Sequence, residues 1–141
     1  MRYLLDTCIL VSALRSRNGA SNALLRLVFA RGLRVVVHFK LIAEYRDLLL
    51  RKENLAATGL GEDQVDRFLS AYVGLAEEVQ VHYLWRPNLT DEDDNFIMEI
   101  AIAASPCTIV THNMRDFLQA ERQFAGIRVL QPAALLQSRH H

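Results

Sequence analysis

Residues 3–14 read YLLDTCILVSAL, and this stretch decides the fold. It begins with a short apolar run, Tyr3-Leu4-Leu5, which ends at Asp6 and is typical of a buried strand. From Ile9 to Leu14 the apolar residues recur at helical spacing, so a helix follows the strand directly. We therefore expect a strand–helix unit with a carboxylate at the junction of its two elements.

The alternation of strands and helices continues along the chain. The β-branched run Arg34–His38 predicts a second buried strand, and later apolar runs give further elements. The predicted strands are 3–5, 34–38, 108–110 and 129–130, and 79–83 is a further candidate for a short strand. The predicted helices are 9–14, 21–30, 39–50, 65–73 and 96–104, followed by a helical turn at Pro132. Such alternation favours a three-layer α/β/α fold with a central parallel sheet.

Length and composition indicate one domain. The chain has 141 residues, 51% of them hydrophobic, which is enough for a single core. We place the domain at 1–137 and treat 138–141 as a disordered tail or tag remnant, because the chain ends in Arg139-His140-His141. The stretch Lys52–Gly61 resembles a linker but is too short to separate domains.

Charge, cysteines and hydropathy exclude several classes of protein. Lys+Arg and Asp+Glu both number 16, so net charge gives no reason to expect nucleic-acid binding. Cys8 and Cys107 lack the spacing of a zinc site, which favours reduced thiols in a cytoplasmic protein. No apolar run approaches the roughly 20 residues of a membrane span, and the N-terminus does not resemble a secretory signal.

Three acidic positions lie where a parallel fold can bring them together. Asp6 ends the first strand, Glu44 lies on the 39–50 helix near its apolar stripe, and Asp94 opens the helix that follows Thr90. Hydrolysis of a phosphodiester needs charge neutralisation and a strong nucleophile, and Mg²⁺ held by several carboxylates supplies both.

Each of these acids also has a structural interpretation. Asp6 can be simply the N-cap of a helix, with no role in catalysis. The cluster from Asp91 to Asp94 can be a solvated helix start whose negative charge complements the helix dipole. Glu44 is harder to explain in this way, because an unpaired carboxylate near a buried stripe is costly. Thr111 can likewise be a strand-terminal hydroxyl bonded to the backbone.

Four blocks in order resemble the PIN-domain ribonucleases. They cover nearly the whole chain and consist of residues 4–14, Glu44–Leu49, Asp91–Phe96 and Val110–Phe117. The resemblance implies a PIN-like fold and an RNA-cleaving site in which Asp6, Glu44 and Asp94 bind one or two Mg²⁺ or Mn²⁺ ions. Hydrolysis would then use a carboxylate-bound metal and an activated water.

The resemblance is incomplete at two positions. Asn113 stands where family members often have a fourth Asp, so Asn113 and Thr111 are candidates to orient water or phosphate, with Asp116 as a reserve acid. Cys8 replaces the Asn or Ser often found two residues after the first Asp, which removes a polar group beside the metal ligands. Ser12 is a further candidate on the first helix.

The resemblance also implies partners. Similar proteins are often homodimeric toxins of bacterial toxin–antitoxin pairs, inhibited by a small antitoxin whose tail enters the acidic groove. RNA phosphates need basic side chains, and the candidates that flank the acidic blocks are Arg15, Arg17, Arg46, Arg51, Lys52 and Arg115.

Two other interpretations compete with the nuclease. A catalytically weakened PIN-like module would bind RNA or protein, as the changes at Cys8 and Asn113 allow. A phosphatase of the haloacid-dehalogenase type also begins with a strand that ends in Asp, but it needs a second Asp two residues later, where this chain has Cys8.

Overall fold

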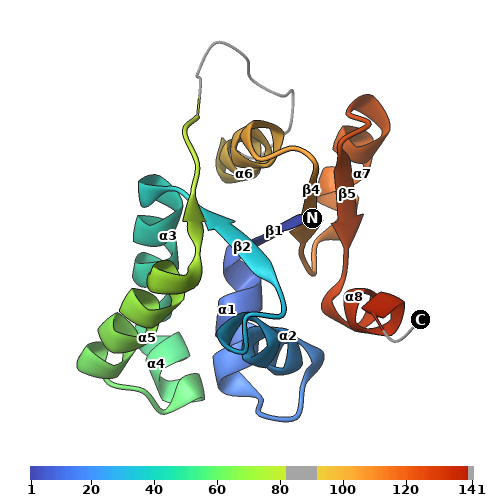
Figure 1. Cartoon of the computed structure of the whole chain (residues 1–141). Helices are drawn as coiled ribbons and strands as arrows, with labels where there is room; N and C mark the ends of the chain where they lie inside the picture. Colours follow the sequence, from blue (N-terminus) through green and yellow to red (C-terminus); the bar gives the residue numbers. More distant parts are fainter. Residues whose placement is uncertain (82–91, 140–141) are drawn as a thin grey trace.

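A parallel sheet of five strands runs through the part of the chain that the computed structural model describes, residues 1–81 and 92–139 (Figure 1). The side chains of 92–95 and 119–120 lie outside this description. The strands are β1 (Arg2–Leu5), β2 (Arg34–Val37), β3 (Glu77–Glu78), β4 (Cys107–Val110) and β5 (Ile127–Leu130), in the spatial order β3-β2-β1-β4-β5. The predicted α/β fold with a central parallel sheet is therefore confirmed.

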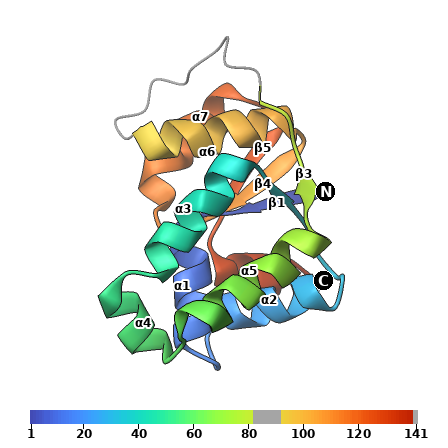
Figure 2. The same cartoon turned by 90° about the vertical axis from the view of Figure 1, so that its left-hand side faces the viewer.

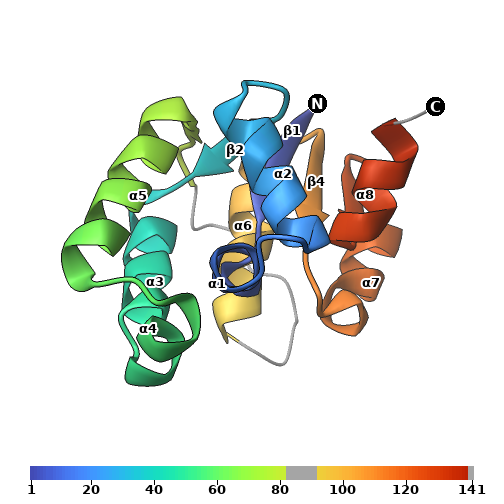
Figure 3. The same ribbon diagram turned by 90° about the horizontal axis from the view of Figure 1, so that it is seen from below.

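Helices cover both faces of this sheet. The helices are α1 (Thr7–Arg15), α2 (Ala20–Phe29), α3 (Phe39–Leu49), α4 (Lys52–Thr58), α5 (Glu62–Leu75), α6 (Glu92–Ala103), α7 (Met114–Gln123) and α8 (Pro132–Arg139). Figure 2 shows α6 and α7 above the sheet and α1, α2, α5 and α8 below it. Seen from below, α1 lies between α3 and α2 (Figure 3). These are the three layers that the sequence predicts.

The core forms where strands are apolar along their whole length. All four residues of β4 are buried, as are Leu4 and Leu5 of β1 and Val35–Val37 of β2. Strands covered on both faces by helices need this continuous apolar sequence rather than an alternating one. The central strands β1 and β4 are thereby held rigidly, and their carboxyl ends provide a fixed support for polar side chains.

Four elements differ from the sequence prediction. The linker-like stretch contains α4, which ends at Gly59 in the left-handed conformation (φ 74°), a common helix ending. The third strand is β3 rather than 79–83, because an edge strand tolerates charged residues such as Glu77. The helix α7 was not predicted, and α8 is a full helix that includes residues 138 and 139, which the sequence placed in a tail.

No helix in the described ranges is long and apolar enough to cross a membrane.

Candidate active site

Asp6 is the first residue beyond β1 and the N-cap of α1. Its backbone is extended (φ −63°, ψ 155°), and its Oδ1 accepts a hydrogen bond from the backbone N–H of Thr7 at 2.8 Å. The residue is only 6% exposed. The capping role considered from the sequence is therefore real, but it uses only one of the two carboxylate oxygens.

Thr111 contacts the other oxygen of the Asp6 carboxylate. In the parallel register Leu5 pairs with Val110, so the next residue of each strand, Asp6 and Thr111, lies at the same edge of the sheet. The fully buried Thr111 Oγ1 donates to Asp6 Oδ2 at 2.7 Å and accepts from the backbone N–H of Asn113 at 3.0 Å. Thr111 thus connects the carboxylate to the loop after β4.

Cys8 also lies against Asp6. Its Sγ is 3.7 Å from Asp6 Oδ2, within the range of a weak thiol hydrogen bond. Burial, and then the negative charge of Asp6, raise the pKa of the Cys8 thiol to about 11. The thiol is therefore protonated at neutral pH and donates to the carboxylate, so the sulfur preserves part of the polar contact that the sequence suggested was lost.

Tyr45 joins α3 to the end of β1. Its hydroxyl donates to the backbone carbonyl of Leu5, and its ring packs edge-on against Tyr72 with centroids 6.0 Å apart. The pKa of Tyr45 is raised well above its ordinary value. Burial is the largest cause, and the interactions of the hydroxyl with Tyr72, Asp6 and Glu44 add to it. Sequence analysis missed this positioning residue, although a Tyr within the apolar stripe of a helix needs a partner for its hydroxyl.

Glu44 lies next to Tyr45 on α3 and is half-buried. Because Asp6 and Glu44 both act electrostatically on the Tyr45 hydroxyl, the two carboxylates are close to one buried group. The packing of α1 against α3 places them on facing elements. Both carboxylates therefore lie within electrostatic reach of the Tyr45 hydroxyl, and a shared role for Glu44 and Asp6 stays a prediction.

The start of α6 lies at the same edge of the sheet. The Phe96 ring packs edge-on against His38 at 5.3 Å between centroids, and Lys40 Nζ lies 4.7 Å from its centre. The residues His38 and Lys40 lie at the start of α3, just beyond β2. Asp94 is in the first turn of α6, and its side chain is outside the described residues. The fold thus places the helical turn of Asp94 beside α3.

Asn113 and Asp116 lie farther from the buried carboxylate. Both are exposed at the start of α7, where the Asn113 carbonyl accepts from the Asp116 N–H at 3.1 Å. Within the described ranges, neither side chain forms a hydrogen bond with Asp6. Sequence analysis also missed Glu99, a buried carboxylate on α6; its signal was a single charge in the apolar run from Phe96 to Ile102.

The surroundings of Asp6 suit a hard cation. Its described hydrogen-bond donors are a backbone amide, a hydroxyl and a thiol, all neutral, and no Lys, Arg or His of the described residues forms an ion pair with it. A buried carboxylate without a cationic partner is costly, and oxygen ligands of this kind are preferred by Mg²⁺. Among the described residues, which do not include the Asp94 side chain, no group of three His, Cys, Asp or Glu side chains gathers.

The sequence profile of the PIN domain matches residues 2–115. This chain belongs to the PIN-domain family. The matched segment contains the whole arrangement from Asp6 to Asn113 and the helical turn of Asp94. Members of this family are generally nucleases, so the polar edge of the sheet is the candidate active site. No curated protein matches the chain by sequence.

Two solved structures share the fold of this PIN domain. One is VapBC2 from Rickettsia felis bound to a DNA fragment from their promoter, with 17% identity, a TM-score of 0.58 and coverage of 93% of this chain and 98% of that chain. The other is FitAB bound to an IR36 DNA fragment. It has 20% identity and a TM-score of 0.59, and the alignment covers 92% of this chain and 94% of that chain. Both alignments cover more than nine-tenths of this chain, so the likeness concerns the fold as a whole.

Proposed function

We propose that this PIN domain is a divalent-metal-dependent endoribonuclease that acts as the toxin of a toxin–antitoxin pair. The observation that carries the proposal is the Asp6 carboxylate, which is buried at the sheet edge and receives hydrogen bonds only from neutral groups of the described chain. A cation from solution would supply the missing positive charge. The order of acidic blocks along a PIN domain supports the same conclusion.

Asp6, Glu44 and Asp94 are the residues that would hold Mg²⁺ or Mn²⁺. When bound, such a cation neutralises negative charge on the scissile phosphate and activates water for attack. Asp6 is fixed at both carboxylate oxygens, by the Thr7 amide and by the Thr111 hydroxyl. Oδ1 retains a further lone pair for a ligand, whereas Oδ2 already accepts from the Thr111 hydroxyl and weakly from the Cys8 thiol. The site is thus organised before the substrate arrives, which reduces the cost of reorganisation.

The remaining residues would position the reacting groups. Tyr45 fixes the carbonyl end of β1 against α3, and Thr111 fixes the carboxylate against the loop after β4. Asn113 is exposed beside that loop, where its side-chain amide is available to a phosphate oxygen or to water. Asp116, on the exposed first turn of α7, is the reserve acid.

An antitoxin partner, a homodimeric state and a cytoplasmic location complete the proposal. The fold is shared with chains in VapBC2 and FitAB, both of which were solved on DNA. For the present chain, this likeness favours a small protein partner that regulates the nuclease. Both cysteines are free thiols, as expected of a protein from a reducing compartment.

Cleavage of single-stranded RNA tests the nuclease directly. The purified chain is incubated with a mixed-sequence RNA in Mg²⁺, in Mn²⁺ and in EDTA, beside an Asp94→Asn variant whose folding is checked by circular dichroism. We expect cleavage that requires metal and is lost in the variant. Cleavage that persists in EDTA would contradict the metal-dependent mechanism.

One specific observation favours a second candidate, a binding module with weakened catalysis. The position of the fourth acid holds Asn113, which carries no charge, and Cys8 offers Asp6 a neutral thiol. This candidate predicts RNA binding without cleavage in either metal. The cleavage assay, combined with an RNA-binding measurement in EDTA, therefore separates the two functions.

A further inference from the structure

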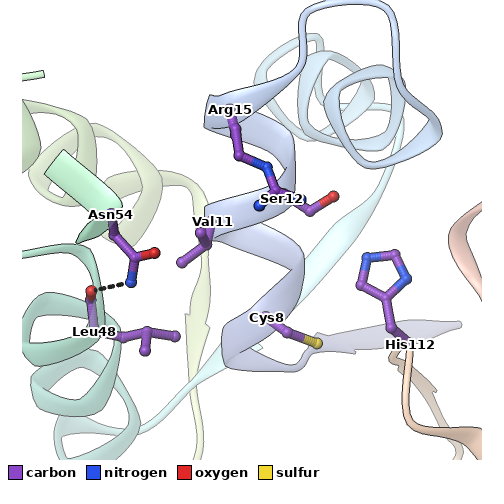
Figure 4. Close-up of a pocket in the computed structure, with 7 residues that line it drawn as sticks. All are labelled: Cys8, Val11, Ser12, Arg15, Leu48, Asn54 and His112. Carbon is purple, nitrogen blue, oxygen red and sulfur yellow. Dashed lines mark hydrogen bonds between the residues drawn. The ribbon is translucent and has the colours of Figure 1, made fainter. Parts of the chain in front are cut away.

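We propose that a cavity beside Asp6 binds one nucleotide of single-stranded RNA, next to the phosphate that is cleaved. This inference rests on the proposed nuclease function and assigns it a substrate subsite. The cavity lies between α1, α3, α4 and the loop after β4 and has a volume of about 510 Å³ (Figure 4). That volume falls within the range of small-molecule sites, and one nucleotide is a ligand of this size.

One face of α1 forms the wall of this cavity. Cys8, Val11, Ser12 and Arg15 line it, and they stand at the spacing i, i+3, i+4 and i+7 that places residues on the same side of a helix. Cys8 is also the residue whose sulfur lies 3.7 Å from Asp6 Oδ2. The cavity therefore begins at a residue in contact with Asp6 and reaches Arg15 about two helical turns away.

The opposite wall suits the face and edge of a base. Leu48 on α3 is apolar and half-buried, and it lines the cavity across from the half-buried Val11 of the α1 wall. Asn54 on α4 donates its Nδ2 to the Leu48 carbonyl at 2.7 Å, which fixes the orientation of the amide. Figure 4 shows the amide oxygen of Asn54 turned toward α1. The oxygen can accept from the N–H groups on the edge of a base, while the apolar side chains contact its face.

Arg15 supplies the charge that a phosphate needs. It is exposed and forms no ion pair with any described residue, whereas Arg46 is bonded to Glu62 and Asp66. Ser12 is a hydroxyl donor on the same helix face, and His112 closes the cavity from the loop after β4. An unpaired guanidinium over a cavity that leads to a carboxylate site fits a phosphodiester chain better than an uncharged ligand.

Binding of a labelled RNA without cleavage tests the subsite. The probe is a fluorescein-labelled, mixed-sequence single-stranded RNA of 12 nucleotides, and its anisotropy is measured in EDTA over a range of KCl concentrations. For Arg15→Gln we expect binding about tenfold weaker and a salt slope lower by about 0.7, the value for one phosphate contact on a single strand. Arg67→Gln is the matched control, an exposed arginine on α5 outside this cavity, and it should leave both quantities unchanged.

Asn54→Ala separates base contact from phosphate contact. We expect it to weaken RNA binding while the salt slope stays at the wild-type value, because no phosphate contact is lost. Circular dichroism and the unfolding midpoint establish that each variant is folded. A folded Arg15→Gln variant with wild-type affinity and slope would overturn the subsite, as would a wild-type chain that binds no RNA.

The failure of the subsite and the failure of the nuclease can be told apart. Wild-type cleavage in Mg²⁺ together with unchanged RNA binding by Arg15→Gln would keep the nuclease and reject the subsite. Absence of cleavage together with the expected loss of binding would reject the nuclease, and with it the place of the cavity beside a cleaved phosphate, and would leave the cavity as an RNA-binding site only. If Arg15→Gln weakens only the binding of a protein partner, the cavity is a peptide-docking site and the proposal is wrong.

Discussion

Asp6 and Asp66 are both aspartates in hydrogen-bonded contacts, yet their surroundings differ in every respect. Asp66, on α5, receives two hydrogen bonds from the Arg46 guanidinium at 2.8 and 3.3 Å, and its side chain is 45% exposed. Asp6 is 6% exposed, and its described donors are neutral. Arg46 lowers the pKa of Asp66, chiefly through its hydrogen bond.

The comparison separates a carboxylate whose charge is paired within the fold from one that is proposed to bind a cation. Asp66 has a protein cation, so its charge is satisfied within the fold, and the same contact occupies Arg46, one of the arginines first considered for RNA. Asp6 follows β1, a strand paired on both sides by β2 and β4, but it has no protein cation among the described residues. A carboxylate fixed in this manner is suited to bind an ion or substrate that arrives from solution.

The largest expected effect contrasts Asp6→Asn with Asp66→Asn in the RNA cleavage assay. Asn remains a good N-cap, so the first variant should fold, while losing the charge that holds the cation. We expect its rate to fall on the order of 1,000-fold, since a metal stabilises the transition state by several kcal/mol and about 1.4 kcal/mol corresponds to tenfold. Asp66→Asn should cleave at the wild-type rate. Equal cleavage rates for the two variants would show that Asp6 is not part of the active site.

The next effect concerns the hydroxyl that fixes Asp6. Thr111→Val keeps the shape of the side chain but removes the 2.7 Å hydrogen bond to Asp6 Oδ2. We expect cleavage or metal affinity to fall by about 10- to 100-fold, as is usual when a partner of a metal ligand is lost. Titration of activity with Mg²⁺ measures this change. Thr111→Ser retains the hydroxyl and should recover most of the affinity; if it does not, the methyl group is the important feature.

Tyr45→Phe is expected to act mainly on stability. It removes the hydrogen bond from the buried Tyr45 hydroxyl to the Leu5 carbonyl, which should lower the free energy of unfolding by about 1 kcal/mol. Tyr72→Phe is the matched control. The Tyr72 hydroxyl lies within electrostatic reach of Tyr45 but has no hydrogen-bond partner of suitable geometry among the described residues. In urea unfolding, the free energy of unfolding of Tyr72→Phe should be unchanged or slightly higher. A larger loss of stability in Tyr72→Phe than in Tyr45→Phe would contradict the assignment of the stabilising hydrogen bond to Tyr45.

The smallest effect is expected for the surface ion pair. Because Arg46 lowers the pKa of Asp66 below its ordinary value of 3.8, the pair contributes stability at neutral pH, and this contribution is lost as the pH falls below about 4. Asp66→Asn should therefore lower the unfolding midpoint slightly at pH 7 and by less at pH 3. Thermal unfolding at both pH values, with and without high salt, measures the difference. An effect at pH 3 as large as that at pH 7 would have to come from packing.

The sequence predicted the sheet and most of its edge, because these depend on local patterns. Apolar runs such as Val35–Val37 identify strands, and parallel connectivity puts Asp6 and Thr111 at the same edge. The positions of Tyr45 and Cys8 against Asp6 could not be predicted, since they depend on how α3 and α1 pack. The helix α4 was missed for a related reason: it is short, has no buried residue and is stabilised by contacts rather than by its own periodicity.

The short helix α4 has a consequence for how this PIN domain can vary. It supplies Asn54 to the cavity and packs only the partly buried Leu55 against the core, so its length and sequence can change with little effect on β1 and β4. The acidic edge, in contrast, is held between β1 and β4 and tolerates little change. Under the proposed function, relatives that differ in this peripheral segment would bind different RNAs while they keep the same sheet edge.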